Sequence, residues 1–148
     1  MSSTIVKNSR LCLIYMEGSI NADSYMDMLE NNFFSEVNES LPDNFIWMQN
    51  NTPPHVAQKT KGYLERKGIN TMEWLPMLPD LNPIENIWSM MKDEVYKKKK
   101  VYKNTTELWE AIVAAWHAIP IESFQTLYES IPHRLVKVIE EKGERIQY

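Results

Sequence analysis

The sequence predicts a layered α/β domain in which a short mixed sheet of three to four strands is packed by five to six helices. Apolar runs of strand length alternate with segments of helical periodicity up to the helix that begins at Asn82, and only helical patterns follow. The composition is sufficient for a hydrophobic core, because 43% of the 148 residues are hydrophobic. The chain has 5 Trp, 7 Tyr and 4 Phe but only 4 Gly, so bulky side chains are plentiful. The C-terminal part is therefore predicted to be all-helical.

Short apolar runs predict the strands. Leu11–Met16 is a continuous apolar run, Phe45–Met48 follows a turn that contains Pro42, and Ile69–Trp74 is the third run. A weaker pattern over Thr4–Lys7 predicts a fourth strand that turns into the first run. The choice between three and four strands depends on this N-terminal segment.

Two helices are predicted between these strands. The first covers Ser24–Phe34, and its apolar residues recur at helical spacing after the capping-type residues Asn21 and Asp23: Tyr25, Met28, Leu29 and Phe33. The second is amphipathic and ends near Gly68, with a stripe of Val56, Thr60, Tyr63 and Leu64.

The helices of the C-terminal part have clear start signals. Asn82 is a good N-cap, and Pro83 fits the first position of a helix whose buried stripe is Ile84, Ile87, Trp88, Met91 and Val95. Asn104 and Glu107 form a capping-box pair for the next helix, which ends near Pro120. A short helix around Phe124 and a last one over Pro132–Lys142, closing at Gly143, complete the chain.

Composition and charge exclude several classes of protein. The single cysteine, Cys12, cannot form an internal disulfide and favours a reducing compartment. The sequence has no apolar run of membrane-spanning length and no signal-peptide pattern, so we expect an intracellular protein without a membrane partner. The net charge of -4 argues against a broad nucleic-acid-binding face, although Lys97, Lys98, Lys99, Lys100 and Lys103 make one local basic patch.

Polar residues gather in two loops that follow predicted strands, where open α/β sheets place their sites. The first loop offers Gln49, Asn50, Asn51 and His55, and the second offers Asp80, Asn82 and Glu85. Thirty-four residues separate Asn50 from Glu85, and the two would approach one another if their strands are neighbours.

Three segments resemble the C-terminal part of the catalytic domain of mariner-superfamily DNA transposases, which are enzymes of the DDE/DDD type. They are QNNTPPH at 49–55, EWLPMLPDLNPIENIW at 73–88 and YESIPHRLVKVIEEKG at 128–143. The resemblance implies a single truncated ribonuclease-H-like domain over residues 1–148. The family's first aspartate lies on a central strand that has no counterpart in this sequence, so the domain is expected to be truncated and degenerate.

The same resemblance implies what has happened to the catalytic site. The family's enzymes hold two Mg²⁺ ions on three carboxylates. The second carboxylate position is Asn50 and the third is Glu85. An amide is a neutral, weak ligand, so we expect no catalytic activity, no metal site and no cofactor. A different interpretation of Glu85 is a capping box with Asn82.

Two classes of function remain from the sequence, with a third ranked below them. The first is a protein interaction or assembly module, either a homodimer or a chain whose sheet a protein partner completes. The alternative is a factor that binds nucleic acid weakly and without sequence preference through Lys97–Lys100 and Lys103, since no helix-turn-helix module is present. An active transposase or nuclease subunit ranks last. A transposase origin also predicts a nuclear location.

Overall fold

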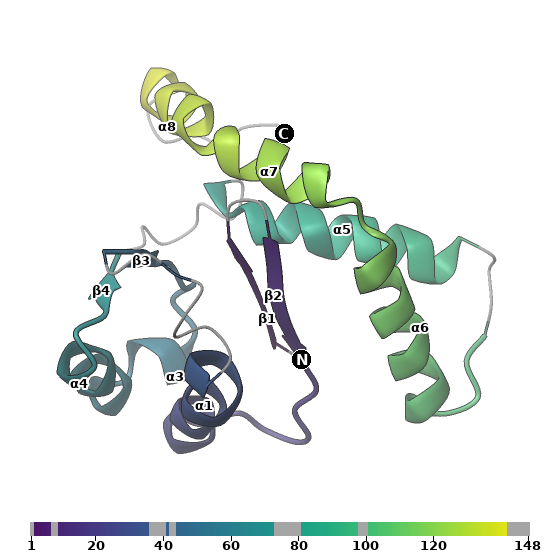
Figure 1. Cartoon of the computed structure of the whole chain (residues 1–148), viewed down its shortest axis with the longest axis horizontal. Helices are drawn as coiled ribbons and strands as arrows, with labels where there is room; N and C mark the ends of the chain where they lie inside the picture. Colours follow the sequence, from purple (N-terminus) through teal and green to yellow (C-terminus); the bar gives the residue numbers. More distant parts are fainter. Residues whose placement is uncertain are drawn as a thin grey trace. The chain divides into compact units, whose positions relative to one another are not determined.

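The computed structural model describes residues 2–6, 9–35, 41, 44–72, 81–97 and 101–141. The chain forms two compact units (Figure 1). Unit 1 comprises Met1–Ser2 and Ile14–Met77, and unit 2 comprises Ser3–Leu13 and Leu78–Tyr148. The single-domain organisation over residues 1–148 stays a prediction.

Unit 1 begins with helix α1, Ala22–Met28, whose start is fixed by a reciprocal capping box. The Asn21 Oδ1 accepts the Ser24 N–H at 2.9 Å, and the Ser24 Oγ accepts the Asn21 N–H at 3.0 Å. Two N–H groups that the helix itself leaves unpaired are thereby satisfied. The predicted capping role of Asn21 is confirmed.

The predicted helix over Ser24–Phe34 changes type at Leu29. Residues Leu29–Phe34 form a π-helix, η1, and this wider turn places both Phe33 and Phe34 on the buried side. In a continued α-helix the residue four positions after the buried Met28 would be Asn32. The π-helix leaves Asn32 exposed and buries Phe34 instead. Apolar spacing predicted the helix but could not predict this change of pitch.

The rest of unit 1 is a β-α-β segment. Strand β3, Ile46–Trp47, pairs in parallel with β4, Asn70–Thr71, and helices α3, Pro53–Val56, and α4, Gln58–Arg66, lie between them in the chain. The predicted helix through Val56 and Leu64 is interrupted, because Ala57 has an extended ψ of 140°. Helix α1 packs on α3 and α4, and the Phe33 and Trp47 rings meet at 4.7 Å between centroids.

Unit 2 contains the C-terminal helices. They are α5, Pro83–Tyr96, α6, Thr105–Ala118, α7, Ile121–Glu129, and α8, Ile131–Glu140. Helix α5 packs on α6 and α7, and α8 packs on α7 (Figure 1). Their core is a cluster of Ile87, Met91, Trp116, Ile119 and Phe124, against which Leu13 also packs.

The strands lie close to their predicted places, and the predicted single mixed sheet stays a prediction because the two strand pairs belong mainly to different units. Strands β1, Ser2–Val6, and β2, Ser9–Ile14, pair with each other, and β3 pairs with β4, so the described residues hold two two-stranded sheets. The predicted strand Ile69–Trp74 is described only as far as Met72, and its paired part is two residues long. Such a short strand offers few backbone groups for a wider sheet. Across the described part of the chain, no helix is long and apolar enough to cross a membrane.

Candidate functional site

Gln49 is the centre of a half-buried hydrogen-bond network that follows β3. Its Oε1 accepts the Tyr25 hydroxyl at 2.9 Å and the Trp47 Nε1–H at 3.1 Å. Its Nε2 donates to the His55 carbonyl oxygen at 3.1 Å. Burial raises the pKa of Tyr25, which keeps its hydroxyl protonated as a donor. The network ties α1, β3 and α3 together immediately before Asn50.

His55 forms a hydrogen bond with the main chain of Asn50. Its Nδ1 lies 3.1 Å from the Asn50 carbonyl oxygen, and its ring stacks on Tyr25 at 4.2 Å between centroids. Because a carbonyl oxygen only accepts, Nδ1 carries the hydrogen in this contact. Burial lowers the pKa of His55, and the bond to Asn50 opposes this shift. His55 therefore links the main chain of Asn50 to the Tyr25 ring.

The Asn50 side chain itself is exposed and engaged locally. Its Oδ1 accepts the Thr52 N–H at 3.3 Å, which is the short-range bond of an Asx turn. The side chain carries no charge, and its oxygen already serves the backbone. Asn50 is the candidate metal ligand of this loop, but its side chain lacks the negative charge that favours binding of a divalent cation.

Glu85 lies in the first turn of α5 and is exposed. The predicted capping box with Asn82 is wrong. The Asn82 Oδ1 accepts the Ile84 N–H at 3.3 Å, whereas the Glu85 N–H donates to the Asn82 main-chain oxygen at 3.1 Å. Asn82 is a simple N-cap because its side chain is turned toward the second helical residue. The Glu85 carboxylate still interacts favourably with the N-terminal end of the helix dipole.

Asn50 belongs to unit 1 and Glu85 to unit 2. Their predicted approach stays a prediction, and Asp80 lies outside the described residues. In the part of the chain that the structure describes, no three His, Cys, Asp or Glu side chains gather closely enough to hold a metal ion. At the position where the resemblance implies a carboxylate, Asn50 supplies a neutral amide, which is a poor ligand for either of two Mg²⁺ ions.

Sequence reasoning missed the role of Arg134. Only 2% of this residue is exposed, its Nη1 donates to the Asn86 Oδ1 at 2.9 Å, and its Nε donates to the Ser130 Oγ at 2.8 Å. The bond to Asn86 joins α8 to the first turn of α5, next to Glu85. The signal in the sequence was a single arginine within an apolar helical segment. It can be interpreted as a buried residue with a hydrogen-bond partner only once the fold is known.

The candidate lysines lie around the connection from α5 to α6. Lys97 forms an exposed ion pair with Glu94 at 3.1 Å, and Lys98–Lys100 lie outside the described residues. The Tyr102 hydroxyl donates to the Val95 carbonyl at 2.6 Å. The predicted capping pair at the start of α6 takes a variant form, since Glu107 accepts the Lys103 N–H at 2.9 Å while Asn104 accepts the Glu107 N–H at 2.8 Å.

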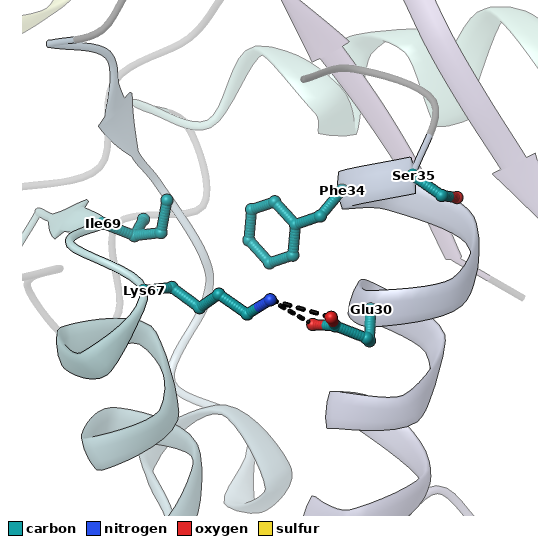
Figure 2. Close-up of a pocket in the computed structure, with 5 residues that line it drawn as sticks. All are labelled: Glu30, Phe34, Ser35, Lys67 and Ile69. Atoms are coloured by element: carbon teal, nitrogen blue, oxygen red, sulfur yellow. Dashed lines mark hydrogen bonds and ion pairs between the residues drawn. The ribbon is translucent and has the colours of Figure 1, made fainter.

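A small open pocket of about 230 Å³ lies between η1 and the end of α4 (Figure 2). Its lining residues are Glu30, Phe34, Ser35, Lys67 and Ile69. Lys67 Nζ lies 2.7 Å from the Glu30 Oε2, and the Tyr63 hydroxyl also donates to Glu30. The bond from Lys67, followed by that from Tyr63, lowers the pKa of the Glu30 carboxyl. The opposite charges in this pocket neutralise each other, so it offers no net charge to a ligand.

Comparison with known proteins gives one consistent relationship. Residues 1–109 match the family described as DDE superfamily endonuclease. The chain is 30% identical to the Tc3 transposase of Caenorhabditis elegans over 142 residues, which cover 96% of the chain and 43% of that protein. It is 32% identical to the Tcb1 transposase of Caenorhabditis briggsae over 133 residues, which cover 88% of the chain and 47% of that protein. The chain thus spans under half the length of these relatives.

Solved structures show the same fold. The catalytic domain of the Mos1 transposase, solved with raltegravir and Mg, superposes with a TM-score of 0.82 at 16% identity, covering 95% of this chain and 73% of that one. A crystal structure of the Mos1 mariner catalytic domain gives a TM-score of 0.78 at 16% identity, covering 97% and 79%. The ribonuclease-H-like fold expected from the sequence is confirmed.

Proposed function

The chain belongs to the DDE superfamily endonuclease family, and from this premise we propose that it is a transposase-related catalytic domain that neither cuts nor joins DNA. In this proposal the fold serves as a protein interaction and assembly module, in a homodimer or with a protein that completes its sheets. A nuclear location belongs to the same proposal.

The observation that carries the proposal is the state of position 50. The resemblance of QNNTPPH to the family implies that Asn50, an amide, stands at the position of the second carboxylate. The Asn50 Oδ1 accepts the Thr52 N–H, and the surrounding network of Gln49, His55 and Tyr25 is fully formed. The local structure around position 50 is therefore formed, although the side chain at this position is neutral. This combination supports retention of the fold for a purpose other than metal-dependent cleavage.

A strand-nicking assay tests the inactivity. We expect no cleavage or joining of supercoiled or nicked DNA by the pure chain with Mg²⁺ or Mn²⁺. Asn50→Asp should not restore activity, because the resemblance accounts for only two of three carboxylates within these 148 residues even after this change. Metal-dependent nicking that is lost in Glu85→Gln and kept in the matched variant Glu110→Gln would overturn the proposal.

Nucleic-acid binding is the second candidate function, and the connection between α5 and α6 favours it. The Tyr102 hydroxyl donates to the Val95 carbonyl and the Lys103 N–H donates to Glu107, so the described residues that follow the lysine run are held to α5 and α6. We expect weak binding that is indifferent to sequence and falls with salt. Fluorescence anisotropy at two salt concentrations measures it. Binding that is unchanged when Lys97–Lys100 are replaced by Ala would contradict this function for the basic patch.

A further inference from the structure

Helix α8 carries an exposed apolar stripe. Leu135, Val136 and Ile139 are 45%, 51% and 76% exposed, and Pro132 is also exposed. The spacing 132, 135, 136 and 139 places these four side chains on one face of the helix. The buried residues of α8, Arg134 and Val138, lie on a different face. Helix α8 therefore uses one face inside unit 2 and presents a second apolar face to solvent.

Two exposed carboxylates of α8 lie at the end of the helix dipole that disfavours them, although Lys137 in the same last turn offsets part of this effect. Glu140 and Glu141 are exposed at the C-terminal end, where a negative charge is unfavourable. At the N-terminal end, the Ser130 side chain makes no capping bond, because its hydroxyl donates to the Leu127 carbonyl and accepts from Arg134. An antiparallel copy of α8 would stabilise both helix ends, because the acidic C-terminal end of each helix would lie beside the positive N-terminal end of the other helix dipole.

The stripe is also symmetric about its own midpoint. In an antiparallel pair centred between Leu135 and Val136, Leu135 lies opposite Val136 and Pro132 lies opposite Ile139. His133 and Glu140 share one flank of the stripe, since seven residues correspond to about two helical turns. In the same pair His133 of one subunit therefore lies beside Glu140 of the partner subunit, and the symmetry makes this contact twice.

From this spacing and charge complementarity we propose that α8 is a homodimer interface, in which it packs antiparallel on α8 of a second copy of the chain. The inference rests on the assembly role proposed above and names its surface and partner. The helix has only ten residues, so the area buried is small and the dimer dissociates on dilution.

Analytical ultracentrifugation of the full chain over a range of concentrations tests the interface. Ile139→Glu should weaken the dimer about tenfold or more, because it places a charge within the apolar stripe, at the end that faces Pro132 of the partner subunit. Val101→Glu is the matched control, since Val101 is 86% exposed in the same unit but lies outside α8. Circular dichroism of both variants establishes that they are folded.

A charge exchange tests the antiparallel orientation. His133→Glu should weaken self-association, because it places two carboxylates side by side in each flanking pair of its homodimer. Glu140→Lys should also weaken it, because it removes the carboxylate that lies beside His133 of the partner subunit. A mixture of the two variants should form heterodimers that regain affinity, since the two substituted positions then form one pair of opposite charge and the second flanking pair is the original His133 with Glu140. A mixture no tighter than either variant would overturn the proposal.

The remaining outcomes are equally decisive. A chain that is monomeric at all concentrations, or a dimer that Ile139→Glu and Val101→Glu affect equally, rules out the α8 interface. Capture of a different protein through the stripe would also rule it out, although the assembly role would then stand. The nicking assay is a separate measurement, so the failure of this inference is distinguishable from the failure of the proposed inactivity.

Discussion

At the scale of single residues, the sequence indicated the right loop but not the roles within it. Gln49, Asn50 and His55 were identified together because a polar loop follows an apolar strand. Local sequence could not show that Gln49 receives two buried donors, because Tyr25 lies on another helix. Gln49 and His55 therefore form the hydrogen bonds that join different elements, whereas the Asn50 side chain bonds only to the nearby Thr52 N–H among the contacts described.

Gln49→Ala should lower the free energy of unfolding by about 1–3 kcal/mol, because the Tyr25 hydroxyl and the Trp47 N–H lose their acceptor. Urea unfolding measures the change. Gln58→Ala is the matched control, because Gln58 is an exposed glutamine at the start of α4. Equal effects of the two substitutions would contradict the role given to Gln49.

Stability should fall as the pH drops below about 6.5. Burial lowers the pKa of His55 from its ordinary value of 6.5, so the unfolded chain takes up a proton before the folded chain does. The stabilisation is complete above the unfolded pKa and is lost as the pH falls toward the folded one. Urea unfolding of His55→Gln at several pH values should show a weaker dependence on pH in this range than unfolding of the unsubstituted chain.

At the scale of helices and strands, the start signals were the most predictable features. Asn21, Asn82 and Asn104 all cap the helices that they were expected to begin. The details of each cap were less predictable, since Asn82 serves Ile84 and Glu107 accepts from Lys103. The π-helix and the break at Ala57 were missed because periodicity reports which residues are apolar and not the local pitch or ψ angle.

The contact between α8 and α5 should be measurable through Asn86. Asn86→Ala removes the acceptor of the buried Arg134 guanidinium and should cost about 1–3 kcal/mol of stability. Ser89→Ala, at an exposed position of the same helix, should cost much less. Thermal unfolding of the two variants side by side provides the comparison, and similar melting temperatures would argue against a structural role for this bond.

At the scale of the whole molecule, the sequence predicted the fold family better than the arrangement of strands. The resemblance carried by PDLNPIENIW implied the ribonuclease-H-like fold, whereas the apolar patterns predicted a layered α/β domain. Strand pairing depends on which segments meet in space, and a single sequence does not contain that information locally. The two two-stranded sheets therefore emerged only from the structure.

Hydrogen exchange should reveal the two compact units. Gln49→Ala should reduce amide protection within Ile14–Met77, and Asn86→Ala should reduce it within Leu78–Tyr148, because each substitution disrupts contacts of its own unit. Mass spectrometry of peptides after exchange in native buffer measures both effects. Uniform loss of protection along the chain in either variant would instead indicate one cooperative domain.

The parallel pairing of β3 with β4 has a consequence for how the protein folds. The register joins Ile46 to Asn70 and Trp47 to Thr71, so helices α3 and α4 must fold back before a short ladder can close. Closing this intervening chain costs entropy before any strand contact compensates for it, whereas a helix forms within about a microsecond. During refolding, helical circular dichroism should therefore recover before the fluorescence of Trp47, whose ring is buried against Phe33 only after the segment has closed. The strand that leads to Asn50 is thus expected to be among the last parts of unit 1 to reach its native position.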